Sequence, residues 1–415
     1  MRSSTSTRST TSRGSSGHTR VCPPASTGAS SLRVTGDPPV FRFQLTTTLC
    51  YGPDSLSALA DLDGRRVLVI TDGFMATTPL MGQVRDALSR ASVEVFDKVI
   101  PNPDVAAVAA GLRAFLEFQP EALVALGGGS PIDTAKAVRK LALEQGHRTD
   151  AGFYVIPTTS GTGSEVTSFA VVTDPHSHAK LPLSSSDMLP DVAILDPAAV
   201  ATAPPRLIAD SGMDAISHAI EAYVALGHND FSDALAEKAL RIADTYLLRS
   251  FRSTTDLKAR EHQHTGATMA GIAFQNSGLG IVHGLSHSIG GSFPVAHGRL
   301  NGILLPHVIE YNADVLGIRP SHVSEVGRRY VSLARALGLS ASSDRNLVFG
   351  LVGWLERVRR ELEMPGTITD AGVDPNEFRA AIPALAATAR KDFCTSGNPV
   401  PATEGDLAGI LHAIV

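Results

Sequence analysis

The sequence has few cysteines and no long apolar segment. Its three cysteines, Cys22, Cys50 and Cys394, are far apart and form no CxxC pair. A disulfide framework or a thiolate zinc site is therefore not expected. No apolar run reaches the ~18 residues that a membrane-spanning helix requires. With 43% hydrophobic and 19% charged residues, the 415-residue chain has the composition of a globular protein large enough for two domains.

Acidic residues are missing from the start of the chain. Residues 1–36 contain five arginines, many Ser, Thr and Gly residues and few large apolar side chains. Because burial there cannot offset chain entropy, we expect a disordered tail over residues 1–38. A mitochondrial transit peptide is the alternative, but no leucine precedes Leu32 to build an apolar helical face. The tail is either dispensable or the result of a start codon assigned too far upstream.

The rest of the chain is acidic. The net charge is −5, so the residues after the basic tail carry a formal charge of −10. This balance argues against nucleic acid and anionic membranes as partners. We therefore expect a cytoplasmic protein that acts on a small molecule.

Strand and helix patterns alternate from about residue 41 to residue 200. Apolar strands are expected at 65–73, 93–96, 122–126 and 153–156, and helices at 80–91 and 104–118. Such alternation predicts a mainly parallel sheet covered on both faces, here over residues 39–200.

The pattern changes near residue 200, where strands give way to helices. The predicted helices of residues 201–415 are 212–225, 230–250, 258–274, 279–290, 299–312, 321–337, 346–361 and 404–414. The expected fold class is therefore α/β plus all-α, in two domains.

Two turns rich in small residues follow strands of the first domain. Residues 127–129 are three glycines, where exposed N–H groups at a helix start can hold phosphate. A second turn, 157–165, follows the next strand, and two such turns suggest a dinucleotide. This is neither a Walker motif nor the GxGxxG fingerprint, and a merely tight turn is the alternative. We assign cofactor contacts to Asp72, Asn102, Gly128, Gly129, Ser130, Asp133, Thr158, Thr159 and Thr162.

Asp72 ends the first predicted strand. There its carboxylate can accept hydrogen bonds from a ribose diol and repel a 2′-phosphate, which favours NAD(H) over NADP(H). The alternative is an aspartate that only terminates the strand.

Acidic and imidazole side chains recur at helical spacing in the second domain. Asp214 and His218 lie four residues apart, as do His283 and His287, and His297 follows ten residues later. Residues four apart share one helix face, and one carboxylate with three imidazoles can enclose a divalent ion. Each histidine alone is equally compatible with an ordinary core or surface position.

The combined motifs resemble the iron-containing (group III) alcohol dehydrogenase family. The resemblance rests on GGGSxxDxAK at 127–136, PTTSGTGSEVT at 157–167, GxDxxxHAxE at 212–221, HxxxH at 283–287 and HGxxN at 297–301, and it covers residues 40–415. Residues 394–399 also resemble the family's C-terminal segment. Residues 71–74 and 273–280 are most similar to propanol dehydrogenases of propanediol breakdown. Phosphonoacetaldehyde reductases of phosphonate biosynthesis are similar too.

The resemblance implies a Rossmann-like domain, a helical metal-binding domain and a metal- and NAD(H)-dependent oxidoreductase. One Fe(II), or Zn(II), would be bound by Asp214, His218, His283 and His297, with His287 close to the metal but not ligating it. A bound ion would polarise the substrate oxygen while the nicotinamide exchanges hydride. His287 is the candidate proton relay, with a purely structural role as the alternative. We also expect a homo-oligomer.

The implied reaction is reversible reduction of a small aldehyde to a primary alcohol. Arg299, two residues after His297, could bind an anionic substrate such as phosphonoacetaldehyde, or it could be solvent-facing or ion-paired. Propanal is the uncharged candidate. The alternative function is that of a metal- and NAD-dependent lyase of the dehydroquinate synthase type, which should need more Lys and Arg around the metal. A catalytically idle binding protein is disfavoured by the intact motifs.

Overall fold

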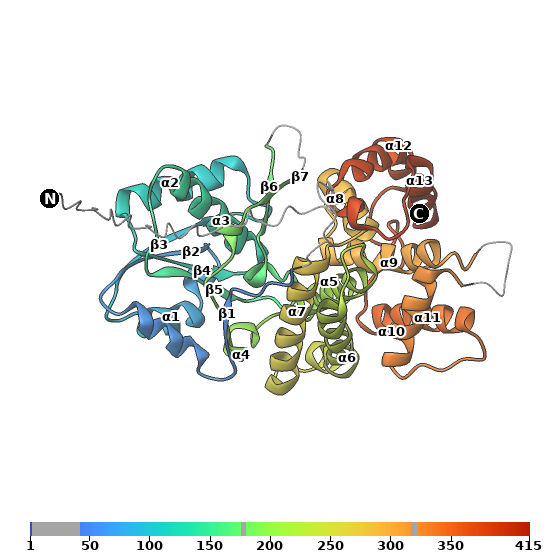
Figure 1. The fold of residues 1–415 in the computed structure, drawn as a ribbon, viewed down its shortest axis with the longest axis horizontal. Coiled ribbons are helices and arrows are strands. Elements are labelled where there is room, and N and C mark those ends of the chain that lie inside the picture. Colours follow the sequence, from blue (N-terminus) through green and yellow to red (C-terminus); the bar gives the residue numbers. More distant parts are fainter. Residues whose placement is uncertain (2–41, 176–179, 317–322) are drawn as a thin grey trace.

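The computed structural model describes residue 1 and residues 42–175, 180–316 and 323–415. Of the predicted tail at 1–38, all but Met1 lies outside these ranges. The described chain forms a sheet-containing half and an all-helical half, which lie side by side (Figure 1). Among the described helices, none combines the length and apolar character needed to cross a bilayer.

A six-stranded sheet forms the centre of the first half. Its strands are β1 (Thr48–Tyr51), β2 (Arg66–Asp72), β3 (Ser92–Val99), β4 (Ala122–Gly127), β5 (Gly152–Pro157) and β8 (Val192–Leu195). They lie in the order β1-β8-β5-β4-β2-β3, and every neighbouring pair is parallel. The predicted parallel sheet is confirmed. Its central strands are buried on both faces, which explains their nearly continuous apolar sequence.

Helical segments cover both faces of this sheet. They are η1 (Ser55–Leu62), η2 (Met75–Thr77), α1 (Pro79–Ala87), α2 (Val105–Phe118), α3 (Gly129–Glu144), η3 (Ser164–Val166), η4 (Ser186–Met188) and α4 (Pro197–Val200). Alternate residues of β2 point to opposite faces: Val69 packs in the cluster under η1 and α1, and Leu68 in the cluster under α2 and α3. The sheet is therefore the middle layer of three.

The second half is built around one buried helix. Its helices are α5 (Pro205–Val224), α6 (Asp230–Arg252), α7 (Leu257–Ser277), α8 (Ile281–Ser292), α9 (His297–Ala313), α10 (Glu325–Ala336), α11 (Asp344–Glu361), α12 (Pro375–Lys391), η5 (Cys394–Gly397) and α13 (Glu404–Ala413). Helix α5 is buried along most of its length and packs against α6, α7 and α9. Its Asp214 and His218 are thereby fixed inside the helical core.

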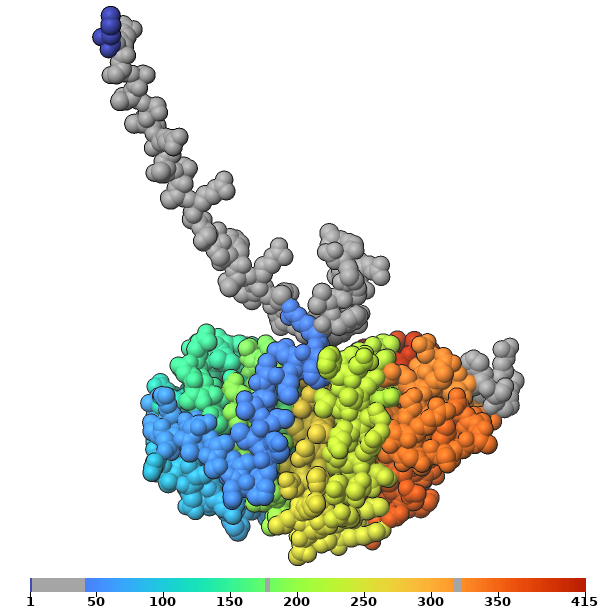
Figure 2. Space-filling view, turned by 60° about the horizontal axis from the view of Figure 1, so that its bottom comes forward, coloured from blue at the N-terminus to red at the C-terminus, as the bar shows by residue number. Residues whose placement is uncertain are grey.

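Contacts between the halves include a hairpin and the segment before β1. An antiparallel hairpin, β6 (Phe169–Thr173) and β7 (Lys180–Ser184), contacts α8. The segment before β1, in blue, runs over the boundary between the halves in Figure 2. There the backbone of Gln44 exchanges hydrogen bonds with the side chain of Asn276, and Phe43 contacts Phe231.

The sequence did not predict the hairpin, the short strands β1 and β8, or α12. Strands of four residues carry almost no periodic signal. Helix α12 contains Pro383, which normally argues against a helix interior, yet tertiary packing of Phe378 and Ile382 maintains it. Helix α10 begins at Glu325, after the N-cap Ser324, and the start predicted at 321 lies outside the described residues.

Candidate metal centre and cofactor site

Three imidazoles converge on one carboxylate oxygen. Oδ1 of Asp214 lies 3.7 Å from Nε2 of His218, 3.7 Å from Nε2 of His283 and 3.5 Å from Nε2 of His297. Ligands bound at about 2.1 Å in a tetrahedral site lie roughly 3.4 Å apart. The predicted ligand set thus has the spacing of groups that share one ion. Ligand atoms of Asp214, His283 and His297 lie within 4.8 Å of one another, and His218 completes the set on the Asp214 side.

The other ring nitrogen of each of these histidines is anchored. Nδ1 of His218 lies 3.1 Å from the carbonyl oxygen of Gly161, and Nδ1 of His297 lies 2.9 Å from Oγ of Ser286. Nδ1 of His283 lies 2.5 Å from Oε2 of Glu221. Such contacts fix the ring orientation and leave Nε2 for coordination.

Burial and charge favour the ligating forms of Asp214 and His218, but not that of His283. Burial raises the pKa of Asp214, but the imidazoles of His218 and His297 outweigh it and hold this pKa below its ordinary value. Burial lowers the pKa of His218 to about 4, so this ring is neutral near pH 7. For His283, burial lowers the pKa, but Glu221 and Asp214 raise it to about 9. An ion that binds Nε2 of His283 must therefore displace a proton.

The position of the Asn301 amide shows that the site suits a cation. Its Nδ2 donates to Oδ1 of Asp214 at 2.8 Å and lies 3.3 Å from Nε2 of His283 and 3.2 Å from Nε2 of His297. Its Oδ1 has no hydrogen-bond partner among the described residues. The partly positive amide thus occupies the point where the ligand atoms converge. One oxygen and three nitrogen donors suit Fe(II) or Zn(II).

A cavity of about 350 Å³ adjoins this centre. It is lined by Asn102 and Lys180 from the sheet half, and by Ser286, His287, Gly290, Phe293, Pro294, Val295, Ala296 and His297 from the helical half. His287 stacks on His297 with ring centroids 5.2 Å apart. Its Nδ1 lies 3.0 Å from Oδ2 of Asp392. The geometry therefore places His287 beside the four predicted ligands and against open space.

Arg299 is ion-paired within the protein. Its guanidinium makes a bidentate pair with Asp210, with Nη2 2.9 Å from Oδ2 and Nε 3.1 Å from Oδ1. Both side chains are mostly buried. The ion-paired alternative is correct for this arginine, because α5 presents a carboxylate across from the start of α9.

The two predicted cofactor turns lie in contact. A Cβ added to Gly128 would lie 3.1 Å from Cγ2 of Thr159, and one on Gly129 would lie 3.2 Å from Cγ2 of Thr162. Gly127, with φ 147°, could not carry a side chain without meeting Pro131. The glycines of the turn therefore carry no side chains over its backbone N–H groups, and the turn leads into the N-terminus of α3. Both features favour binding of an anionic ligand.

The remaining predicted cofactor residues lie at the carboxyl edge of the sheet. Asp72 ends β2, and its Oδ1 accepts a hydrogen bond from the backbone N–H of Met75. Asn102 donates its backbone N–H to Oγ of Ser130 and accepts from Lys180. β2, β4 and β5 are adjacent, so their turns meet where such sheets bind ligands.

Asp133 makes internal contacts instead. Its carboxylate accepts hydrogen bonds from Oγ of Ser164 at 2.7 Å and from the backbone N–H of Val171 at 3.0 Å. The nearby Lys136 donates to Ser164, Thr167 and Phe169. These contacts hold the second turn against α3, so cofactor contact by Asp133 stays a prediction.

Sequence reasoning missed several supporting residues. Glu221 carries a usable signal, because it stands three residues after His218 and residues three apart lie on one side of a helix. That spacing places its carboxylate next to the predicted metal ligands, 2.5 Å from Nδ1 of His283. Asp392 and Lys180 had no such signal, because Asp392 is 105 residues from His287 and Lys180 is on an unpredicted hairpin.

Comparisons with known proteins agree with this geometry. The model of the iron-containing alcohol dehydrogenase family matches residues 46–197, and that of the C-terminal region of the Fe-containing alcohol dehydrogenase family matches residues 208–415. The chain is 35% identical to the 1-propanol dehydrogenase of Salmonella typhimurium, over 90% of this chain and 99% of that protein. It is 34% identical to the NADPH-dependent butanol dehydrogenase of Clostridium saccharobutylicum, over 90% and 98%.

A solved structure supports the same assignment. The crystal structure of a 1,3-propanediol oxidoreductase superposes with a TM-score of 0.82 at 28% identity, covering 91% of this chain and 100% of that one. Together with the two family models, which span most of the chain, this shows that the protein belongs to the iron-containing alcohol dehydrogenase family.

Proposed function

We propose that this alcohol dehydrogenase reduces an aldehyde of about propanal size to the primary alcohol, reversibly, with NADH and one divalent ion. The observation that carries the proposal is the convergence of His218, His283 and His297 on Asp214 beside the cavity between the halves. Fe(II) is our first choice of metal, and Zn(II) suits the same donors. A cytoplasmic location and a homo-oligomer stay predictions.

The protein groups have separable tasks. Asp214, His218, His283 and His297 would hold the ion, which when bound polarises the substrate oxygen for hydride exchange with the nicotinamide. His287 uses Nδ1 in its contact with Asp392, so Nε2 is the ring nitrogen left to pass a proton to the alkoxide. Phe293 and Val295 give the cavity an apolar wall that limits water near the reacting atoms.

The turns after β4 and β5 would hold the dinucleotide. The carboxylate of Asp72 favours a free ribose 2′-hydroxyl over a 2′-phosphate by charge. The butanol dehydrogenase relative is named as NADPH-dependent, so cofactor preference varies among similar chains. The proposal of NADH for this chain therefore depends on Asp72.

Propanal and phosphonoacetaldehyde are the two candidate substrates. The apolar cavity wall and the names of the relatives, a 1-propanol and a butanol dehydrogenase, favour the uncharged aldehyde. Phosphonoacetaldehyde would need a cation. Arg299 is engaged by Asp210, and among the described residues that line the cavity Lys180 is the one with a cationic ammonium group.

The lyase alternative is less well supported. A phosphorylated acid would require several cations around the ion, and the arginine nearest in sequence, Arg299, is neutralised by Asp210. Net consumption of NADH with an aldehyde distinguishes the two, because the lyase reoxidises its cofactor within each turnover.

The test is a metal and activity measurement on anaerobically prepared protein. We expect about one equivalent of iron or zinc per chain, and stoichiometric NADH oxidation with propanal. The ratio of kcat/KM for propanal and phosphonoacetaldehyde identifies the substrate. No NADH oxidation with either aldehyde in metal-loaded protein would contradict the proposal.

A further inference from the structure

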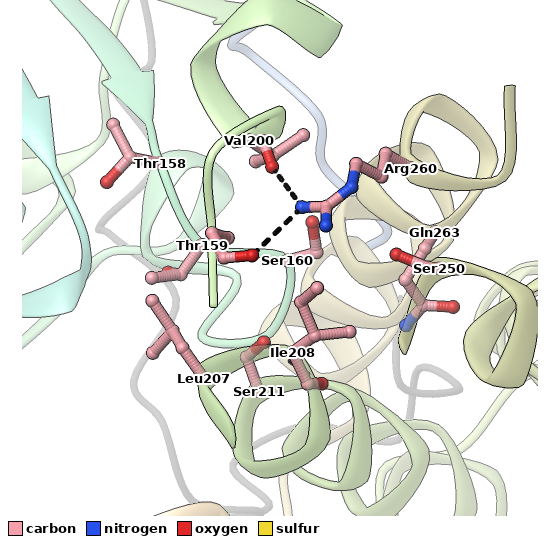
Figure 3. Close-up of a pocket in the computed structure, with 11 residues that line it drawn as sticks. Thr158, Thr159, Ser160, Val200, Leu207, Ile208, Ser211, Ser250, Arg260 and Gln263 are labelled. Carbon is pink, nitrogen blue, oxygen red and sulfur yellow. Dashed lines mark hydrogen bonds between the residues drawn. The ribbon is translucent and has the colours of Figure 1, made fainter. Parts of the chain in front are cut away.

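A small pocket adjoins the second predicted cofactor turn. It is lined by residues of the turn, of the connection after α4 and of helices α5, α6 and α7 (Figure 3). Arg260 of α7 extends into it and donates from Nη1 to the carbonyl oxygens of Val200, at 2.6 Å, and Ala203, at 3.2 Å. The arginine thus joins the helical half to the segment that leaves the sheet half.

The charge of Arg260 has no counterion within the described chain. Its side chain is among the largest that are fully buried, and the residue is 2% exposed. Its Nε and Nη2 have no hydrogen-bond partner among the described residues. Burial lowers the pKa of the guanidinium, and no described carboxylate opposes this shift. A buried, unpaired cation costs several kcal/mol.

Other polar groups of the pocket also lack partners. Oγ1 of Thr159 and Oε1 of Gln263 have no hydrogen-bond partner among the described residues. Ser250 and Ser211 also line this space, and Oγ of Ser211 donates to the carbonyl oxygen of Ile208. Arg260 and Gln263 lie three residues apart on one face of α7. A 180° rotation of the Gln263 amide exchanges its oxygen and its NH₂ group, so the side chain can present either one to the pocket.

The volume restricts what can enter. The cavity volume is about 10 Å³, which is room for about one small group. A phosphate or a carboxylate ligand is too large. The choice is therefore between a water molecule and a monatomic ion.

We propose that this pocket binds one chloride-sized anion. The unpaired guanidinium N–H groups of Arg260 and other polar groups that line the pocket, among them the hydroxyls of Thr159 and Ser250, would supply donors, and the anion would neutralise Arg260. A water molecule would satisfy some hydrogen bonds but would leave the charge. Thr159 also packs against Gly128, so the anion supports the contact between the two predicted cofactor turns. The site does not depend on the proposed reaction.

Diffraction identifies the occupant directly. Crystals of the full chain soaked in sodium bromide should show an anomalous bromine peak within hydrogen-bonding range of Nε and Nη2 of Arg260. A difference peak without anomalous signal would identify a water molecule and overturn the proposal.

Unfolding in solution tests whether the anion stabilises the protein. At constant ionic strength, replacing gluconate by chloride at ten times its Kd should raise Tm by about 2 °C. Gln263→Glu supplies an internal carboxylate and should abolish this chloride effect. Arg329→Met is the matched control, because Arg329 also donates to a carbonyl, that of Tyr223, but already pairs with Asp233. It should keep the full effect.

The two arms give separate refutations. Equal Tm values of the wild type in chloride and in gluconate would mean that no specific anion binds. A full chloride effect in Gln263→Glu would place the binding elsewhere. Either result rejects the assignment. A bromide peak in the crystal would then show binding at crystal concentrations only.

Discussion

Asp392 and His287 are hydrogen-bonded across 105 residues of sequence, with Oδ2 and Nδ1 3.0 Å apart. Asp392 follows α12, and His287 lies on α8. Burial raises the pKa of Asp392, but the contact with His287 outweighs burial and lowers it, so the carboxylate is ionised near pH 7. An ionised partner fixes the Nδ1–H tautomer and leaves Nε2 as a base.

This contact predicts a positioning role for Asp392. Asp392→Ala should lower kcat about 10–100-fold with little change in the KM for NADH, because the ring loses its orientation rather than its cofactor. Asp392→Asn should restore part of the rate, since its amide oxygen can still accept from Nδ1–H. Steady-state kinetics with propanal measure both. Equal activity in Asp392→Ala and the wild type would show that His287 needs no partner.

Removing a metal ligand should remove the metal. Asp214→Ala or His218→Ala should abolish turnover and lower bound iron or zinc, while circular dichroism stays close to that of the wild type. His228→Ala, a partly exposed histidine outside the centre, is the control and should retain its metal. Full activity with unchanged metal content in either ligand variant would refute the ligand assignment.

Cofactor preference depends on the charge of Asp72. Asp72→Gly should narrow the gap between NADH and NADPH, because repulsion of the 2′-phosphate disappears. It also loses the hydrogen bond to Met75. Asp72→Asn is the matched variant, since it can keep that hydrogen bond without the charge. The ratio of kcat/KM for the two cofactors is the measurement. A wild type that prefers NADPH would contradict this role.

The pair formed by Arg299 and Asp210 should act on stability rather than on substrate choice. Arg299→Ala leaves a mostly buried carboxylate without its partner and should cost about 1–3 kcal/mol in the free energy of unfolding. Losses in kcat/KM for propanal and phosphonoacetaldehyde should be equal. Denaturant titration and kinetics test both parts. A selective loss of ~10-fold on the phosphonate, about 1.4 kcal/mol, would instead assign Arg299 to the substrate.

The sequence predicted what depends on local pattern. Buried strands such as β4 and long helices such as α5 have clear apolar periodicity. Motif spacing identified the candidate acid and histidines, and the family resemblance selected the three histidines that converge on Asp214. Contacts between distant segments were not predictable in the same way. Nothing in the sequence indicated that Asp210 neutralises Arg299 or that Asp392 reaches His287, because such pairs depend on how helices cross.

The hydrogen bond from His218 to Gly161 connects the predicted cofactor turn at 157–165 to a predicted metal ligand. Gly161 belongs to the turn predicted to hold the dinucleotide, and its carbonyl oxygen orients a predicted metal ligand at 3.1 Å. Gly161 also lies against the backbone of Ser211, where a side chain would collide. A shift of this turn must therefore move the imidazole. We expect reciprocal coupling: the factor by which dinucleotide raises affinity for the ion equals the factor by which the ion raises affinity for dinucleotide.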